Sequence, residues 1–162
     1  MVQSSLQIPG RLRLLNGVVL WIATGGYSGY IRIIPATFGS FVGLLLFVPL
    51  AMSPVSLQVA LTCILFVLGV WTSGQAEKLM KKKDARPIVI DEIVGMWISL
   101  LFIPQQITYF LGAFILFRLL DILKPFPANQ AQCLTGGLGI MIDDVVAGLY
   151  TNAILHIIYY FL

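Results

Sequence analysis

Charged residues are absent from long stretches of this chain and are gathered into a few short blocks. There is no charged side chain between Arg32 and Glu77, none between Glu92 and Arg118, and none after Asp144. About 20 mostly apolar residues are enough to cross the hydrocarbon core of a bilayer as a helix. The distribution of charge therefore restricts the chain to a fold whose long apolar segments are removed from water.

The composition indicates that lipid, not a soluble core, receives these segments. Hydrophobic residues make up 59% of the 162 residues and charged residues 10%, whereas a soluble domain typically carries about 25% charged residues. So few charges cannot cover the surface of a soluble protein of this size, and we expect lipid to replace water over much of the exterior. The ten basic residues make a poor surface for tracking phosphates, so nucleic-acid binding is not expected.

The apolar runs predict an all-α protein, a compact polytopic membrane helix bundle with short spanning helices and a single domain over residues 1–162. Pro49 and Pro54 favour a turn within the first long run. The segment near 12–23 is expected to form an interfacial or re-entrant helix, followed by a glycine-rich loop. The other expected helices are 37–52, 55–80, 88–103, 107–123 and 143–162.

The run 93–117 fits either one long spanning helix or a hairpin that turns near Pro104. We favour the hairpin because the residue before a proline disfavours the helical conformation. In the hairpin all ten basic and seven acidic residues lie on one side of the membrane, which the positive-inside rule places in the cytoplasm. A single crossing would instead put Asp121 on the opposite side from Asp91.

The hairpin brings five acidic residues from three distant segments to the same level at the ends of membrane helices. Acidic side chains at such positions are costly unless they are paired or bound to a metal. Clustered carboxylate oxygens suit hard cations, and Mg²⁺ usually takes one or two protein carboxylates together with substrate phosphate and water. The alternative for any one of them is an ion pair with Lys or Arg at the headgroup level. The five residues are Asp91, Glu92, Asp121, Asp143 and Asp144.

Asp143 and Asp144 follow a glycine-rich stretch and are expected to open the last helix, where a helix N-terminus favours negative charge. Arg118, Asp121 and Lys124 are spaced three residues apart and are expected to share one helix face. A carboxylate between two cations suits a site for both metal and phosphate, and it equally suits an intrahelical salt bridge.

The segment Pro35–Ser40 is expected to be a loop leading into a helix. Its backbone N–H groups and the hydroxyls of Thr37 and Ser40 suit a phosphate, while either hydroxyl also suits an ordinary helix cap. The basic block from Lys78 to Arg86 is expected mainly to anchor the topology at anionic headgroups, and the alternative is that it also attracts an anionic substrate.

Three of these segments together resemble the phosphatidylglycerophosphatase A family of bacterial membrane enzymes. They are Ile-Val-Ile-Asp-Glu-Ile-Val-Gly-Met-Trp at 88–97, Phe-Arg-Leu-Leu-Asp-Ile-Leu-Lys-Pro-Phe-Pro at 117–127, and Gly-Gly-Leu-Gly-Ile-Met-Ile-Asp-Asp-Val-Val-Ala-Gly at 136–148. A weaker match is Pro-Ala-Thr-Phe-Gly-Ser at 35–40. The resemblance implies Mg²⁺-dependent hydrolysis of phosphatidylglycerophosphate to phosphatidylglycerol and phosphate. It also implies a bacterial inner-membrane location, which with the expected topology puts the site in the cytoplasm.

We therefore predict two groups of site residues. The five carboxylates are expected to be catalytic and to bind one or two Mg²⁺ ions, with either a water or an aspartate as the nucleophile. The substrate phosphate is expected to contact Thr37, Ser40, Arg118 and Lys124. Two alternatives remain, a phosphatidyltransferase acting on CDP-lipids and a small cation channel or transporter subunit. The pattern leaves the oligomeric state open.

Overall fold

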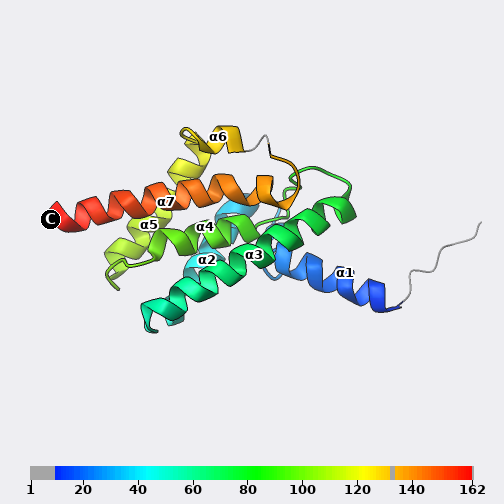
Figure 1. The fold of residues 1–162 in the computed structure, drawn as a ribbon, viewed down its shortest axis with the longest axis horizontal. Helices are drawn as coiled ribbons and strands as arrows, with labels where there is room; N and C mark the ends of the chain where they lie inside the picture. Colours follow the sequence, from blue (N-terminus) through cyan, green and yellow to red (C-terminus); the bar gives the residue numbers. More distant parts are fainter. Residues whose placement is uncertain (1–9, 132–133, 162) are drawn as a thin grey trace, which may run out of the picture.

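The computed structural model describes residues 10–131 and 134–161, and over these residues the protein is helical and contains no strand (Figure 1). This confirms the predicted all-α fold. The elements are α1 (Gly10–Ala23), the 3₁₀ helix η1 (Ser28–Tyr30), α2 (Pro35–Ala51), α3 (Val55–Met80), α4 (Ile90–Leu100), α5 (Ile107–Leu123), α6 (Ala128–Ala131) and α7 (Gly137–Phe161).

Most helix boundaries follow the prediction, but the start of α7 does not. The helix begins at Gly137, so the prediction that Asp143 and Asp144 open it is wrong. Its glycines serve close packing instead of a flexible loop. A Cβ on Gly137 would lie 1.8 Å from the Val70 carbonyl oxygen, and one on Gly139 would lie 2.1 Å from the Leu134 carbonyl oxygen. The two acidic residues therefore lie in the second turn of the helix, away from its N-terminus.

The short helix α4 occupies the centre of the bundle, packed against α2, α3, α5 and α7 (Figure 1). Nine of its eleven residues are buried, on all sides of the helix. A helix that is buried on all sides is normally apolar, because a polar side chain buried there loses its contact with water at a cost in free energy. The two acidic residues of its first turn, Asp91 and Glu92, are the exception that requires a functional explanation.

The hairpin between α4 and α5 is confirmed, with a turn over residues 101–106. The Asn152 side chain of α7 donates to the carbonyl oxygen of Leu101 at 2.7 Å and so satisfies a group that the end of α4 leaves open. Gln58 donates to the Ala51 carbonyl at 3.1 Å, and Gln105 donates to the same carbonyl. Gln58, in the first turn of α3, and Gln105, in the turn between α4 and α5, thus meet at the uncharged end of the bundle.

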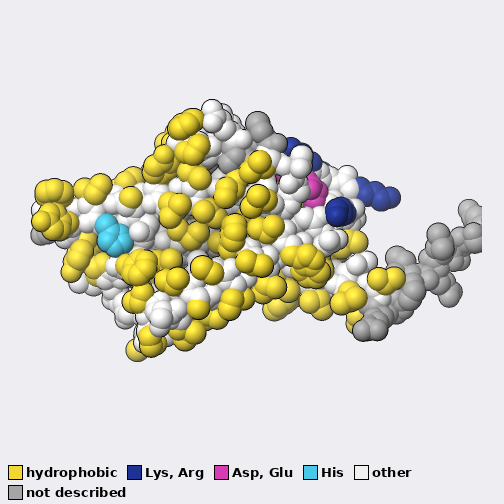
Figure 2. All heavy atoms as spheres, viewed as in Figure 1, with side chains coloured by type: hydrophobic (Ala, Val, Ile, Leu, Met, Phe, Trp, Pro, Cys, Tyr) yellow, Lys and Arg dark blue, Asp and Glu magenta, His cyan; other side chains and the backbone are white. Residues whose placement is uncertain are grey.

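Two described helices, α3 and α7, are long and apolar enough to cross a membrane. The most apolar 18 residues of α3 have a mean hydropathy of 2.0, yet only 22% of them are buried inside the protein. A core helix of a soluble protein would bury such a segment. Figure 2 shows hydrophobic side chains over most of the visible face, with Lys, Arg, Asp and Glu gathered at one end. This surface is that of a membrane protein.

Candidate active site

Helices α4 and α7 approach each other closely, and this contact brings distant acidic residues together. A Cβ on Gly95 would lie 2.7 Å from the backbone carbonyl oxygen of Asp144, and one on Gly148 would lie 2.5 Å from the carbonyl oxygen of Gly95. Small residues allow the backbones of two membrane helices to touch in this way. The contact places α7 beside the first turns of α4.

Three carboxylates form a cluster at this contact. One oxygen from each of Asp91, Glu92 and Asp144 lies within 4.8 Å of the others, and all three residues are buried. Asp91 Oδ1 and Glu92 Oε2 have no hydrogen-bond partner among the described residues. Buried carboxylates without partners are strongly unfavourable, so the cluster requires a compensating charge.

The geometry of the cluster suits a hard divalent cation. Ligand oxygens on opposite sides of a Mg²⁺ ion are about 4.2 Å apart at the usual bond length of about 2.1 Å. The three oxygens lie within 4.8 Å of one another, so small side-chain adjustments would bring them around one ion. A buried acidic cluster able to hold a metal ion is thus present at the position predicted for Asp91, Glu92 and Asp144.

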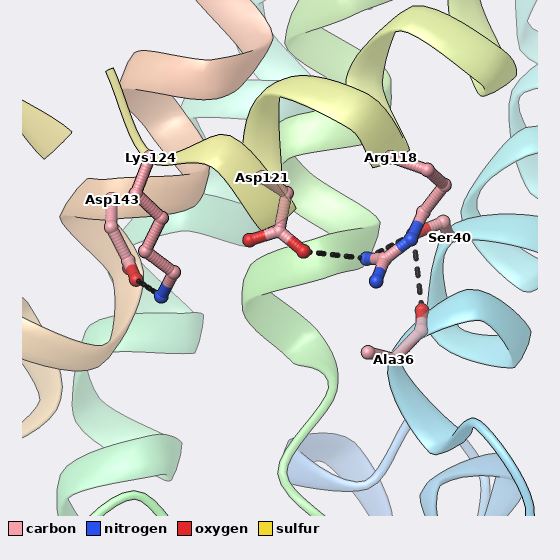
Figure 3. A network of polar contacts seen from close by, with 6 residues as sticks. All are labelled: Ala36, Ser40, Arg118, Asp121, Lys124 and Asp143. Atoms are coloured by element: carbon pink, nitrogen blue, oxygen red, sulfur yellow. Dashed lines mark hydrogen bonds and ion pairs between the residues drawn. The ribbon is translucent and has the colours of Figure 1, made fainter. Parts of the chain in front are cut away.

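The other two predicted carboxylates lie close by but are held in ion pairs (Figure 3). Asp121 Oδ2 is 2.8 Å from Arg118 Nη1, and Asp143 Oδ2 accepts a hydrogen bond of 2.7 Å from Lys124 Nζ. Arg118 and Asp121 share a helix face as expected. Lys124 does not, because it lies past the last residue of α5 with φ of 44° and reaches across to α7. The five predicted carboxylates therefore divide into a cluster of three and two that form ion pairs.

The segment Pro35–Ser40 forms the first turns of α2, so the prediction of a loop there is wrong. The fully buried Ser40 hydroxyl donates to the Ala36 carbonyl at 3.0 Å and accepts a hydrogen bond of 3.3 Å from Arg118 Nη1 (Figure 3). Thr37 is half-buried. Ser40 therefore supports Arg118, which in turn holds Asp121. Direct contact of Thr37 or Ser40 with a substrate stays a prediction.

A cavity of about 500 Å³ opens beside the cluster, in the size range of small-molecule sites. All five predicted carboxylates line it, and so does Lys124, whereas Arg118 lies behind Asp121 and does not. Three lining residues, Arg32, Asp84 and Arg86, were not predicted. A signal for them existed, because they fall in the charged blocks directly before α2 and α4, at the same end of the bundle.

Burial and nearby charges shift the pKa of two titratable groups at the edge of the cavity. Partial burial raises the pKa of the Asp84 carboxyl above its ordinary value, and the nearby Asp143 carboxylate adds to the increase. Burial alone would lower the pKa of Lys124, but its hydrogen bond to Asp143 and the surrounding carboxylates outweigh this effect and raise it. Lys124 therefore stays a cation in the cavity at neutral pH.

Fold and site together define a helical membrane protein that buries a carboxylate cluster, with space for a metal ion and an anionic ligand, at one end of its bundle. The family model for phosphatidylglycerophosphatase A matches residues 21–159. The chain belongs to the phosphatidylglycerophosphatase A family, as the resemblance of its motifs predicted.

Curated relatives cover most of this chain. It is 38% identical to phosphatidylglycerophosphatase A of Haemophilus influenzae over 155 residues, 94% of each chain. It is 36% identical to phosphatidylglycerophosphatase A of Escherichia coli over 150 residues, 91% of this chain and 87% of the relative. It is also 35% identical to a putative phosphatidylinositol-3-phosphatase of Bacteroides thetaiotaomicron over 138 residues, 80% of this chain and 86% of the relative. No solved structure matches the chain.

These comparisons confirm the predicted class, an enzyme of a phosphatase family, and support its association with a membrane. The names of the relatives point to two different lipid phosphates. The roles of individual site residues stay predictions.

Proposed function

We propose that this protein hydrolyses phosphatidylglycerophosphate to phosphatidylglycerol and phosphate in a Mg²⁺-dependent reaction. The observation that carries the proposal is the buried cluster of Asp91, Glu92 and Asp144, with two oxygens left without partners, in a chain of the phosphatidylglycerophosphatase A family. The substrate is chosen because the family model and two of the three relatives carry its name.

Mg²⁺ fits the cluster because all three donors are carboxylate oxygens, the ligands that this hard cation prefers. When bound, the ion supplies charge neutralisation at the phosphate and polarises an attacking water. Asp91 and Glu92 hold their side of the site from the first turn of α4, and Asp144 completes it from the second turn of α7.

The remaining groups act on the phosphate and on each other. Lys124 Nζ has three N–H donors, of which Asp143 takes one, so the others can bind phosphate oxygens in the cavity. Cationic donors that are already in position stabilise the charge that develops in the transition state. Arg118 holds Asp121 at the cavity wall and so acts as a positioning residue.

We further propose that the protein is a multi-pass protein of the bacterial inner membrane with the cavity open to the cytoplasm. The charged end of the bundle carries the basic block Lys78–Arg86, and basic residues are enriched in cytoplasmic loops. At this end a phosphorylated headgroup reaches the carboxylates from the headgroup layer while the acyl chains stay in the bilayer.

The test is release of phosphate from phosphatidylglycerophosphate in detergent micelles, with Mg²⁺ or with a chelator. We expect activity only with Mg²⁺, and a loss of about 100-fold or more in kcat for Asp91→Asn, Glu92→Gln and Asp144→Asn. Glu77→Gln is the matched control, because Glu77 does not line the cavity and only accepts a hydrogen bond from the Asp84 backbone N–H, which a glutamine oxygen can also accept. Full activity in all three site variants would reject the role of the cluster.

A parallel assay with phosphatidylinositol 3-phosphate tests the other substrate named among the relatives. Faster turnover of that lipid than of phosphatidylglycerophosphate would overturn the choice of substrate and keep the phosphatase. Release of a nucleotide from a CDP-lipid, or ion flux through liposomes without lipid turnover, would favour the two other classes.

A further inference from the structure

Two of the cationic side chains that line the cavity form no ion pair with its carboxylates. Lys124 is paired with Asp143. Arg32 and Arg86 also line the cavity, and within the described part of the chain neither forms an ion pair or a side-chain hydrogen bond. Two unpaired guanidinium groups that line one cavity suit an anionic ligand, because their planar donors match phosphate oxygens.

Close backbone packing brings the two arginines to the same cavity. Arg32 follows η1 and Arg86 precedes α4, and the two segments touch at Gly29, where an added Cβ would lie 2.0 Å from the Pro87 carbonyl oxygen. The Val89 backbone N–H donates to the Ala23 carbonyl at 2.9 Å and ties the same segments together. The backbone positions of both arginines are therefore fixed by the fold.

An apolar rim adjoins this cationic wall. Ile34 and Ile122 line the same cavity, and their side chains are 57% and 70% exposed. Ile34 is only two residues from Arg32, so an unpaired cation and an exposed apolar side chain lie together at the edge. The cavity is thus lined by two sets of residues, buried carboxylates and exposed arginines with apolar neighbours.

These two sets of lining residues match a lipid that carries two phosphates of different kinds. Both lipids named among the relatives carry a phosphomonoester on a polar group, and in both a phosphodiester joins that group to diacylglycerol. We propose that Arg32 and Arg86 bind the phosphodiester while the carboxylate cluster acts on the terminal phosphomonoester. This inference rests on the proposed function and deepens it, because it makes the diester a recognition element of the substrate.

The test separates the two phosphates by using an inhibitor for each. Dihexanoyl-phosphatidylglycerol, used below its micellar concentration, carries only the diester, and inorganic phosphate represents only the monoester. For Arg32→Gln and Arg86→Gln we expect the inhibition constant of the short-chain lipid to rise about tenfold each, the effect of losing a charge-assisted hydrogen bond, while that of inorganic phosphate stays within about twofold. The unchanged constant for phosphate also shows that the variants are folded.

Lys82→Gln is the matched control, because Lys82 is an exposed cation of the same loop that does not line the cavity. We expect wild-type inhibition constants for this variant. An equal rise for lipid in Lys82→Gln would overturn the inference in favour of general attraction of anions. An equal rise for both inhibitors in the arginine variants would overturn it as well, because the arginines would then bind the scissile phosphate.

The outcomes also distinguish the inference from the proposed function. A wild-type protein that turns over phosphatidylglycerophosphate but is not inhibited by dihexanoyl-phosphatidylglycerol, or whose arginine variants keep the wild-type constants, would disprove the diester subsite alone. A wild-type protein that releases no phosphate from phosphatidylglycerophosphate would disprove the proposed function.

Discussion

At the scale of single residues, the site depends on a chain of supporting contacts. Ser40 on α2 accepts a hydrogen bond from Arg118, and Arg118 holds Asp121 at 2.8 Å. Arg118 was predicted to contact the substrate, but the structure places it behind Asp121 and outside the cavity lining. Its effect on the reaction should therefore pass through Asp121.

Arg118→Lys tests this role. Lysine keeps the charge but lacks the planar fork that reaches Asp121 and Ser40 together, so the pair should lose its geometry. We expect kcat to fall about tenfold, the cost of roughly 1.4 kcal/mol in the transition state, with KM changed less than about twofold. Steady-state kinetics on phosphatidylglycerophosphate gives both values. A large rise in KM with unchanged kcat would show direct substrate contact instead.

Ile34 has an unusual backbone conformation at the cavity rim. Its φ and ψ of 67° and 54° lie in the left-handed region, which a β-branched side chain rarely adopts. Such a conformation costs about 1–3 kcal/mol and persists only where the surroundings enforce it. The contact between η1 and α2, on either side of this residue, thus keeps an isoleucine where glycine or asparagine would be favoured.

Ile34→Asn should therefore stabilise the protein, because asparagine tolerates this conformation. We expect a rise of about 2–4 °C in the thermal midpoint for roughly 1 kcal/mol of relieved strain. Thermal unfolding in detergent measures it. Ile33→Asn is the control, since Ile33 is 77% exposed and its φ is not positive. Equal midpoints for the two variants would contradict the strain.

At the scale of elements, the contact between α4 and α7 determines the geometry of the carboxylate cluster. Two glycines, Gly95 and Gly148, form it, and neither has room for a Cβ. Asp144 can meet Asp91 and Glu92 only while these backbones touch.

Gly95→Ala should separate the two helices. The new Cβ would lie 2.6 Å from the Phe117 ring and 2.7 Å from the Asp144 carbonyl oxygen. Overpacking of this kind costs about 1–3 kcal/mol, and we expect phosphatase activity to fall about tenfold or more because Asp144 moves away from α4. Gly112→Ala is the matched control on α5, where the added Cβ meets only Leu155 at an ordinary 3.6 Å. Loss of activity in the control alone would contradict the argument.

At the scale of the whole molecule, the buried carboxylate cluster lowers the free energy of unfolding of the metal-free protein. Three carboxylates are buried beside the cavity at one end of the bundle, where charges without a partner are costly. A bound cation would recover this cost and link metal binding to the stability of the entire bundle.

Thermal unfolding with Mg²⁺ and with a chelator tests this link without measuring activity. We expect Mg²⁺ at 100 times its Kd to stabilise the wild type by about 2.7 kcal/mol. Asp144→Asn should raise the midpoint of the metal-free protein, because it removes one buried charge, and should abolish most of the response to Mg²⁺. Glu77→Gln should behave as the wild type. A wild-type midpoint that is insensitive to Mg²⁺ would refute the metal site.

The proposed orientation is a further property of the whole molecule. With Cys63 and Cys133 replaced, a cysteine at Lys82 should react with a membrane-impermeant maleimide only from the cytoplasmic side. Met52 lies in the uncharged turn after α2 and is 84% exposed, so a cysteine there is open to the reagent. It should react only from the opposite side. Labelling of intact cells and inverted vesicles measures this. Reaction of both positions from the same side would disprove the topology.

The amino-acid sequence alone determined the broad arrangement of this protein. Uncharged runs located the long helices, and Pro104 indicated the turn that confines all the acids to one end of the bundle. Local chemistry is sufficient for these features, because the conformational restriction before proline and the cost of charge in lipid do not depend on the rest of the fold. The five candidate carboxylates and the family followed from the same local motifs.

Only the tertiary structure decided how those acids divide and what surrounds them. Asp91, Glu92 and Asp144 form the open cluster, whereas Asp121 and Asp143 are paired with cations. This division depends on how each helix is rotated and on how closely the glycines of α4 and α7 let the backbones approach. Arg32 and Arg86 join the same cavity through packing between segments far apart in the chain. Such contacts depend on residues distant in sequence, so no local pattern specifies them.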